Sequence, residues 1–132
     1  MRVNGSVNLV LVVDDLEEWR RLATLLLENV GYETRSVSNG HEALTYLHDH
    51  PDVTAAIVLD LNMPVMSGWE FMKRQQENGF KNIPVILFSG EVEPPDSKLE
   101  GTSVVAFVSK DHTIDGLVPA VNMALERTRV SA

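Results

Sequence analysis

The 132-residue sequence contains no cysteine, and this absence excludes disulfide bonds, zinc sites built on thiolates and cysteine nucleophiles. Long apolar runs are also missing: stretches such as LVLVV are far too short to cross a bilayer. The first eight residues, MRVNGSVN, carry one basic residue and no apolar region, so they do not form a signal peptide. We therefore expect a cytoplasmic protein without a membrane partner.

Basic residues are few: 11 lysines and arginines face 19 acidic residues, and the formal net charge is −8. Contacts with phosphates need a basic patch, so we expect no nucleic-acid partner. Hydrophobic residues make up 44% and charged residues 23%, which is ordinary for a globular protein of one domain. We expect a single domain over residues 1–132, with a core at about 8–128 and a loosely ordered extension at 1–7.

Short β-branched runs alternate with stretches of helical periodicity. Five strands are predicted at residues 9–13, 34–37, 55–59, 85–88 and 104–108. Helices are predicted between Leu16 and Val30, after Asn39, after Ser67 and over residues 114–127. This alternation is typical of a doubly wound α/β domain, in which helices cover both faces of a parallel sheet.

The polarity of the strands predicts their places in the sheet. The strands that begin near Leu9, Ala55, Val85 and Val104 are almost entirely apolar, which favours central positions buried on both faces. The strand at 34–37 is more polar and is predicted to be an edge strand. In the segment 90–103, GEVEPPDSKLEGTS, two adjacent prolines leave room for only about two helical turns, so the fourth helix is expected to be short or irregular.

Polar residues follow the strands at the edge where an open parallel sheet places its chemistry. They are Asp14 and Asp15 after the first strand, Asp60 after the third, Ser89 after the fourth and Lys110 after the fifth. Singly, each has a plain explanation as a helix cap, a turn residue or a solvated lysine. Together, three converging carboxylates repel one another, and a divalent cation would hold them ionised. Oxygen ligands alone favour Mg²⁺, with Mn²⁺ as the alternative ion.

A hard cation beside a carboxylate, a lysine and a hydroxyl is suited to phosphoryl chemistry. Asp60 is the candidate nucleophile and would form an aspartyl phosphate. Lys110 would neutralise phosphoryl oxygens, and Ser89 would hydrogen-bond one of them.

These residues resemble the receiver domain of bacterial two-component response regulators over nearly the whole chain. The matching motifs are LVVDD, DLNMPVMSGWE, VILFSG and FVSK, in that order. The resemblance implies a sheet in the order 2-1-3-4-5 and a phosphoacceptor at Asp60. It also implies a metal site formed by Asp14, Asp15, Asp60 and the backbone carbonyl of Asn62, and a phosphoryl-binding role for Lys110.

The resemblance further implies a switch. Ser89 matches the hydroxyl that moves toward the phosphoryl group, and Phe107 matches the aromatic residue that reports this movement; a plain core role for Phe107 is equally compatible with the sequence. The implied phosphodonor is a histidine kinase or a histidine phosphotransfer protein, and the output is contact with an unknown downstream protein. Asp111 follows Lys110 where the family commonly has proline, so we expect a trans peptide bond there.

Two rival functions remain open from the sequence. The first is a phosphohydrolase with Asp60 as nucleophile, although no second acid–base motif or substrate-enclosing cap is visible. The second is a pseudo-receiver that binds partners without phosphorylation, which the complete acidic set disfavours. We favour a phosphoacceptor that is not an enzyme in its own right. Because the sequence ends soon after the last helix, we expect a stand-alone regulator or phosphorelay shuttle, although an excised domain would look the same.

Overall fold

The computed structural model describes residues 8–131, with side chains up to residue 126, so the expected extension at 1–7 lies outside the described residues. Within this range the strands are parallel and form one sheet in the order β2-β1-β3-β4-β5, which confirms the predicted fold. The elements are β1 (Leu9–Val13), α1 (Glu17–Asn29), β2 (Glu33–Val37), α2 (Gly40–Asp49), β3 (Thr54–Leu59), α3 (Gly68–Glu77), β4 (Val85–Ser89), α4 (Asp96–Leu99), β5 (Val104–Ser109), the 3₁₀ turn η1 (Lys110–His112) and α5 (Thr113–Ser131).

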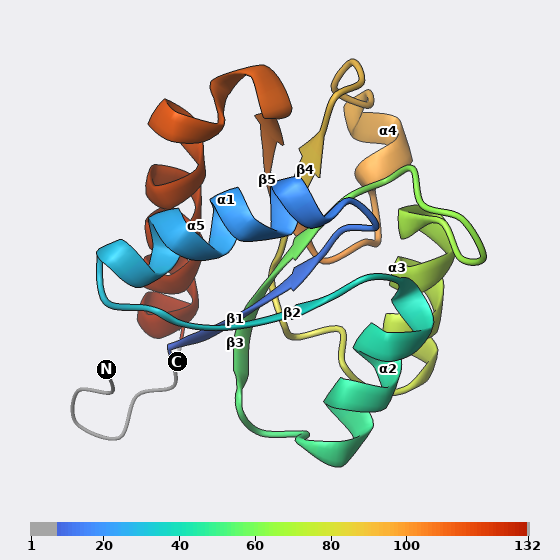
Figure 1. The fold of residues 1–132 in the computed structure, drawn as a ribbon. Helices are drawn as coiled ribbons and strands as arrows, with labels where there is room; N and C mark the ends of the chain where they lie inside the picture. The colour runs from blue at the N-terminus through green and yellow to red at the C-terminus, as the bar shows by residue number, and fades with distance from the viewer. Residues whose placement is uncertain (1–7, 132) are drawn as a thin grey trace.

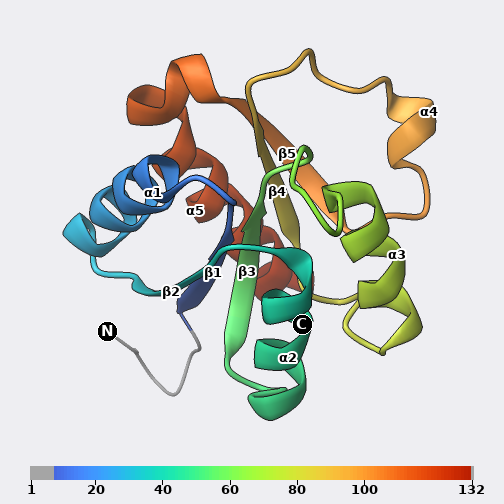
Figure 2. The ribbon, with the colours of Figure 1, turned by 45° about the vertical axis from the view of Figure 1, so that its right-hand side comes forward.

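Helices cover both faces of the sheet. Figure 1 shows α1 and α5 on one side and α2 and α3 on the other, and the rotated view in Figure 2 shows the same separation. Each face has its own apolar cluster, because alternate side chains of a buried strand point to opposite faces. No helix within residues 8–131 has both the length and the hydropathy that a bilayer-spanning segment needs.

Two helix starts follow the predicted capping pattern. The side chain of Asn39 accepts a hydrogen bond from the Glu42 amide at 2.9 Å, and the Glu42 carboxylate accepts one from the Ser38 amide at 2.7 Å. At α3, the Ser67 hydroxyl accepts a hydrogen bond from the Glu70 amide at 3.1 Å. Both caps satisfy amides that the first helical turn leaves without partners, so these starts are set by local sequence.

The first helix is shorter than its apolar spacing predicts. Leu16 has an extended backbone, with φ −98° and ψ 123°, and donates its amide to Asp14 Oδ1 at 3.0 Å. Helix α1 therefore begins only at Glu17. Leu16 and Val30 lie just outside the helix and remain 47% and 53% exposed, so they are not part of its buried face.

The fifth strand is at the edge of the sheet, as the order 2-1-3-4-5 implied by the resemblance requires, so the central position favoured by its apolar sequence is wrong. Most residues of β5 are only partly buried, whereas every residue of β4 is buried. Helix α4, which includes Leu99 and follows Pro94 and Pro95, has only four residues and confirms the predicted short fourth helix. An apolar strand can therefore stay half-exposed, because the element above it is too short to cover it.

Candidate functional site

The three aspartates predicted at the strand ends lie together. The Asp14 amide donates to the Val37 carbonyl at 3.2 Å, and the Asp60 amide donates to the Val13 carbonyl at 3.0 Å. These bonds continue the strand pairing and fix both aspartates at the same sheet edge. One carboxylate oxygen from each of Asp14, Asp15 and Asp60 lies within 4.8 Å of the other two. Asp14 and Asp60 are buried, at 0% and 4% exposure, and Asp15 is half-buried.

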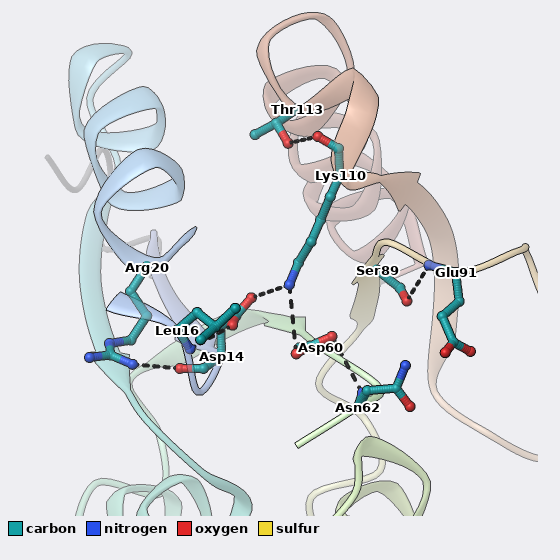
Figure 3. Close-up of polar contacts among 9 residues, drawn as sticks. All are labelled: Asp14, Leu16, Arg20, Asp60, Asn62, Ser89, Glu91, Lys110 and Thr113. Atoms are coloured by element: carbon teal, nitrogen blue, oxygen red, sulfur yellow. Dashed lines mark hydrogen bonds and ion pairs between the residues drawn. The ribbon is translucent and has the colours of Figure 1, made fainter. Parts of the chain in front are cut away.

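Lys110 reaches into this acidic cluster from the start of η1. Figure 3 shows its side chain between Asp14 and Asp60, with the ammonium 2.9 Å from Asp14 Oδ2 and 3.6 Å from Asp60 Oδ2. Its backbone is anchored by Thr113, whose hydroxyl donates to the Lys110 carbonyl at 2.7 Å. No cis peptide bond occurs among the described residues, which agrees with the trans bond expected before Asp111.

The electrostatics of the site centre on Asp60. Burial, together with the nearby Asp14 carboxylate, raises the pKa of Asp60 from 3.8 to about 6. Lys110 and the Asn62 amide, which donates to Asp60 Oδ1 at 3.4 Å, pull the pKa of Asp60 the other way without offsetting the rise. The site therefore carries an excess of negative charge that a cation can neutralise.

The donor set fits a hard divalent cation. All three clustered ligands are carboxylate oxygens, which is the chemistry of Mg²⁺ sites. Asp14 Oδ2 is buried and, within the described residues, has no hydrogen-bond partner of good geometry, although it forms the ion pair with Lys110. A buried carboxylate oxygen in this condition has lone pairs to offer a metal ion.

Ser89 and Asn62 flank the cluster on the side away from Asp14 (Figure 3). Ser89 is fully buried at the end of β4, and its hydroxyl accepts a hydrogen bond from the Glu91 amide at 3.1 Å. Asn62 is exposed in the loop after β3. Gly68 packs closely against the start of that loop: a Cβ at this position would lie 2.6 Å from the Asp60 carbonyl oxygen. The path of the loop therefore depends on glycine.

Phe107 lies on β5 in register with Leu87, while Ser109 is in register with Ser89. Its side chain is half-buried and packs against the apolar cluster beneath α2 and α3. Phe107 therefore belongs to the partly covered β5 face and lies one strand away from Ser89.

Two residues near the site were not identified from the sequence. Arg20 donates from Nη1 to the Asp14 carbonyl at 2.7 Å, and Trp19 lies with its ring 5.0 Å from the Lys110 ammonium. Trp19 falls within the helix predicted between Leu16 and Val30, and in the structure it is partly buried against the core. Their positions in the sequence could have indicated this. Both residues lie four or five positions after Asp15, and the start of a helix at this sheet edge passes close to the site.

Comparisons with known proteins agree with this geometry. Residues 10–122 match the family model of the response regulator receiver domain. The chain is 33% identical over 96 residues to the CAI-1 autoinducer sensor kinase/phosphatase CqsS of Vibrio cholerae, covering 71% of this chain and 14% of that protein. It is 32% identical over 124 residues to the regulatory protein AtoC of Escherichia coli, covering 92% of this chain and 26% of that protein.

A solved structure is similar as well. The response regulator TrrA of Thermotoga maritima, in complex with Mg²⁺–BeF, has a TM-score of 0.78 and 27% identity over 90% of this chain and all of that chain. The chain spans only 14% and 26% of the two curated relatives named above, so it corresponds to one part of each. The family match, the sheet order and the acidic cluster show that this chain belongs to the response regulator receiver domain family.

Proposed function

We propose that Asp60 accepts the phosphoryl group. The observation that carries this proposal is the position of its carboxylate, buried at the end of β3, clustered with Asp14 and Asp15, and 3.6 Å from the Lys110 ammonium. A nucleophilic carboxylate needs neighbouring positive charge to approach a phosphate. Lys110 supplies one such charge, and the acidic cluster can hold another.

The proposed phosphodonor is a phosphohistidine of a histidine kinase or histidine phosphotransfer protein. An Asp60 oxygen forms a bond to phosphorus, the P–N bond breaks, and the imidazole nitrogen leaves with the bonding electrons and takes up a proton. In the second half of the cycle, the aspartyl phosphate is hydrolysed: water attacks phosphorus, inorganic phosphate leaves and the Asp60 carboxylate is restored. The similarity to part of a sensor kinase/phosphatase supports a partner of this class, and the cytoplasm is the proposed site of transfer.

A magnesium ion would be held by Asp14, Asp15, Asp60 and the backbone carbonyl of Asn62. When bound, it would neutralise charge on the transferring phosphoryl oxygens and on the carboxylates. Asp14 Oδ2 supports this assignment because it is buried, and its ion pair with Lys110 at 2.9 Å leaves lone pairs that a metal ion can use. Lys110, whose ammonium lies 3.6 Å from Asp60 Oδ2, would bind a phosphoryl oxygen.

Ser89 is the proposed hydrogen-bond donor to the phosphoryl group. Its contact with the Glu91 amide uses an acceptor lone pair, so the hydroxyl proton remains able to donate elsewhere. If Ser89 turns toward a phosphoryl group on Asp60, the space beside it changes, and Phe107 on the neighbouring strand can repack. We propose that this repacking shifts the population of two arrangements of the β4–β5 side.

The downstream partner is proposed to contact the face formed by α4 and β5. An open pocket of about 340 Å³ lies there, lined by Glu93, Asp96, Leu99, Glu100, Val104, Val105, Ala106 and Phe107. Phe107 connects this pocket to the strand pair that carries Ser89. A change at the phosphorylation site would therefore alter the shape of the pocket.

The decisive experiment is incubation with Mg²⁺ and acetyl phosphate, followed by intact-protein mass measurement. We expect one added phosphoryl group, lost in Asp60→Asn and in the presence of chelator, and retained in the matched control Asp52→Asn, which changes an exposed aspartate. Labelling of Asp60→Asn to the wild-type extent would refute the assignment. Sustained turnover of a simple phosphate ester would favour a phosphohydrolase instead, and failure to bind Mg²⁺ would favour a pseudo-receiver.

A further inference from the structure

Two aromatic side chains from separate elements lie near the Lys110 ammonium. Its Nζ lies 5.0 Å from the ring centre of Trp19 on α1 and 5.5 Å from that of Phe88 on β4. The two rings contact each other edge to face, with centres 5.8 Å apart and planes at 86°. Both distances to the ammonium are within the range in which an aromatic face attracts a cation. The rings of Trp19 and Phe88 therefore both contribute to the surroundings of the Lys110 ammonium.

The ammonium also has two carboxylates as neighbours. Asp14 Oδ2 is 2.9 Å from the ammonium and Asp60 Oδ2 is 3.6 Å from it. The Lys110 side chain is only 10% exposed, so water screens these attractions weakly. The ammonium is thus attracted both by negative charge and by electron-rich rings.

The backbone alone does not place the ammonium. The Thr113 hydroxyl holds the Lys110 carbonyl at 2.7 Å, and the Ser109 hydroxyl accepts from the Asp111 amide at 3.3 Å. These bonds fix the turn, but four carbons joined by rotatable bonds separate the lysine backbone from its ammonium. The end of the side chain is therefore located by the groups that surround it.

We propose that Trp19 is a positioning residue for Lys110, holding its ammonium beside Asp60 so that it can meet an incoming phosphoryl group. This inference rests on the proposed role of Lys110 in phosphorylation. Phe88 is fully buried and contributes to the core, whereas Trp19 is partly buried on a surface helix and can be changed with less disturbance. Without the indole ring, the ammonium has a wider range of positions and is less often near Asp60.

The first test measures the rate of phosphorylation by acetyl phosphate with Mg²⁺. Trp19→Leu removes the aromatic face and is expected to slow phosphorylation about fivefold, whereas Trp19→Phe keeps a ring and stays within about twofold of wild type. In a Lys110→Met background, Trp19→Leu is expected to cause no further slowing, because the tryptophan acts through the lysine. Leu26→Ala removes packing from the same helix and is the control for a general loss of stability.

The second test does not depend on phosphorylation. The chain has two tryptophans, and each faces its own lysine: Trp69 lies 5.3 Å from Lys98 Nζ, as Trp19 lies near Lys110. In Trp69→Phe protein, Lys110→Met is expected to change the tryptophan emission and Lys98→Met to leave it unchanged. In Trp19→Phe protein the effects of the two lysine substitutions are expected to exchange.

The outcomes separate the two proposals. Wild-type labelling by Trp19→Leu, or equal slowing of Trp19→Leu with and without Lys110, would show that Trp19 only packs. Wild-type protein that is never labelled on Asp60 would refute the proposed function, while the emission test would still show whether the Trp19 ring lies at the Lys110 ammonium. If Trp19→Leu does not fold, the emission test decides, because it keeps the indole ring in place; unchanged emission in Lys110→Met would overturn the proposal.

Discussion

Lys110 Nζ lies 2.9 Å from Asp14 Oδ2 and 3.6 Å from Asp60 Oδ2, so the lysine is paired more closely with the proposed metal ligand than with the proposed phosphoacceptor. A divalent cation bound by Asp14 would compete with this ion pair. Because like charges repel, the cation would also weaken the hold of the carboxylates on Lys110. Metal binding and release of Lys110 are therefore expected to be linked.

This link predicts the effect of Lys110→Met on metal affinity. Removing the ammonium leaves the carboxylates with less positive charge nearby, so Mg²⁺ is expected to bind about tenfold more tightly. Calorimetric titration at low ionic strength measures the change. Lys98→Met, an exposed lysine on α4, is the matched control and should bind Mg²⁺ like the wild type. Weaker binding by Lys110→Met would contradict competition for Asp14.

A second prediction concerns Asp60 and pH. Its pKa rises from 3.8 to about 6 on folding, so the folded protein holds this proton more tightly than the unfolded chain does. The ionised Asp60 carboxylate therefore destabilises the fold increasingly as pH rises from about 4 to about 6. Above about pH 6 this destabilising contribution approaches its maximum. In chelator at pH 7, Asp60→Asn is expected to raise the free energy of unfolding by up to about 3 kcal/mol.

Urea unfolding at several pH values tests this prediction. The difference between Asp60→Asn and wild type should vanish below about pH 3, where the wild-type carboxyl is protonated in both states. Added Mg²⁺ should stabilise wild type more than the variant and so reduce the difference. A stability difference that does not change with pH would show that the variant acts through packing alone.

A third prediction concerns Gly68. A Cβ there would lie 2.6 Å from the Asp60 carbonyl oxygen and 2.8 Å from Leu61 Cα, and both of these are backbone atoms that cannot move aside cheaply. Gly68→Ala is expected to lower the free energy of unfolding by about 2–3 kcal/mol and to slow phosphorylation by displacing Asp60. Gly90→Ala is the control, because its Cβ would meet no atom within 4 Å. Equal stability of the two variants would refute the close approach at Gly68.

A fourth prediction concerns strain in the loop after Asp60. Val65 has φ 71°, and the Met66 amide donates to the Pro64 carbonyl at 2.7 Å across it, which makes a tight γ-turn. Such a conformation is unfavourable for a β-branched residue, and Val65 is 79% exposed, so its side chain adds little packing. Val65→Gly is expected to raise the free energy of unfolding by about 1 kcal/mol, net of the added chain entropy.

Thermal or urea unfolding of Val65→Gly measures this gain. Val92→Gly is the matched control, since Val92 is 92% exposed and its backbone φ is not positive. The control is expected to lose about 0.5 kcal/mol because glycine only increases the entropy of the unfolded chain. Similar losses in both variants would show that the turn at Val65 is not strained.

Much of this protein could be predicted from local sequence. Asn39 and Ser67 cap their helices as expected, because a cap needs only residues a few positions apart. The convergence of Asp14, Asp15 and Asp60 could also be predicted, since parallel strands deliver their carboxyl ends to one edge. The fold class and the candidate site thus followed from patterns that each segment carries by itself.

Other features were decided only by the tertiary structure. The apolar sequence of β5 favoured a central strand, and although the resemblance implied its edge position, only packing shows that the short α4 leaves the strand partly covered. The closer pairing of Lys110 with Asp14, and the placement of Trp19 beside that lysine, depend on how α1, β4 and η1 pack together. Periodicity in one segment reports burial, whereas the choice of neighbour depends on segments far apart in the chain, which only packing brings into contact.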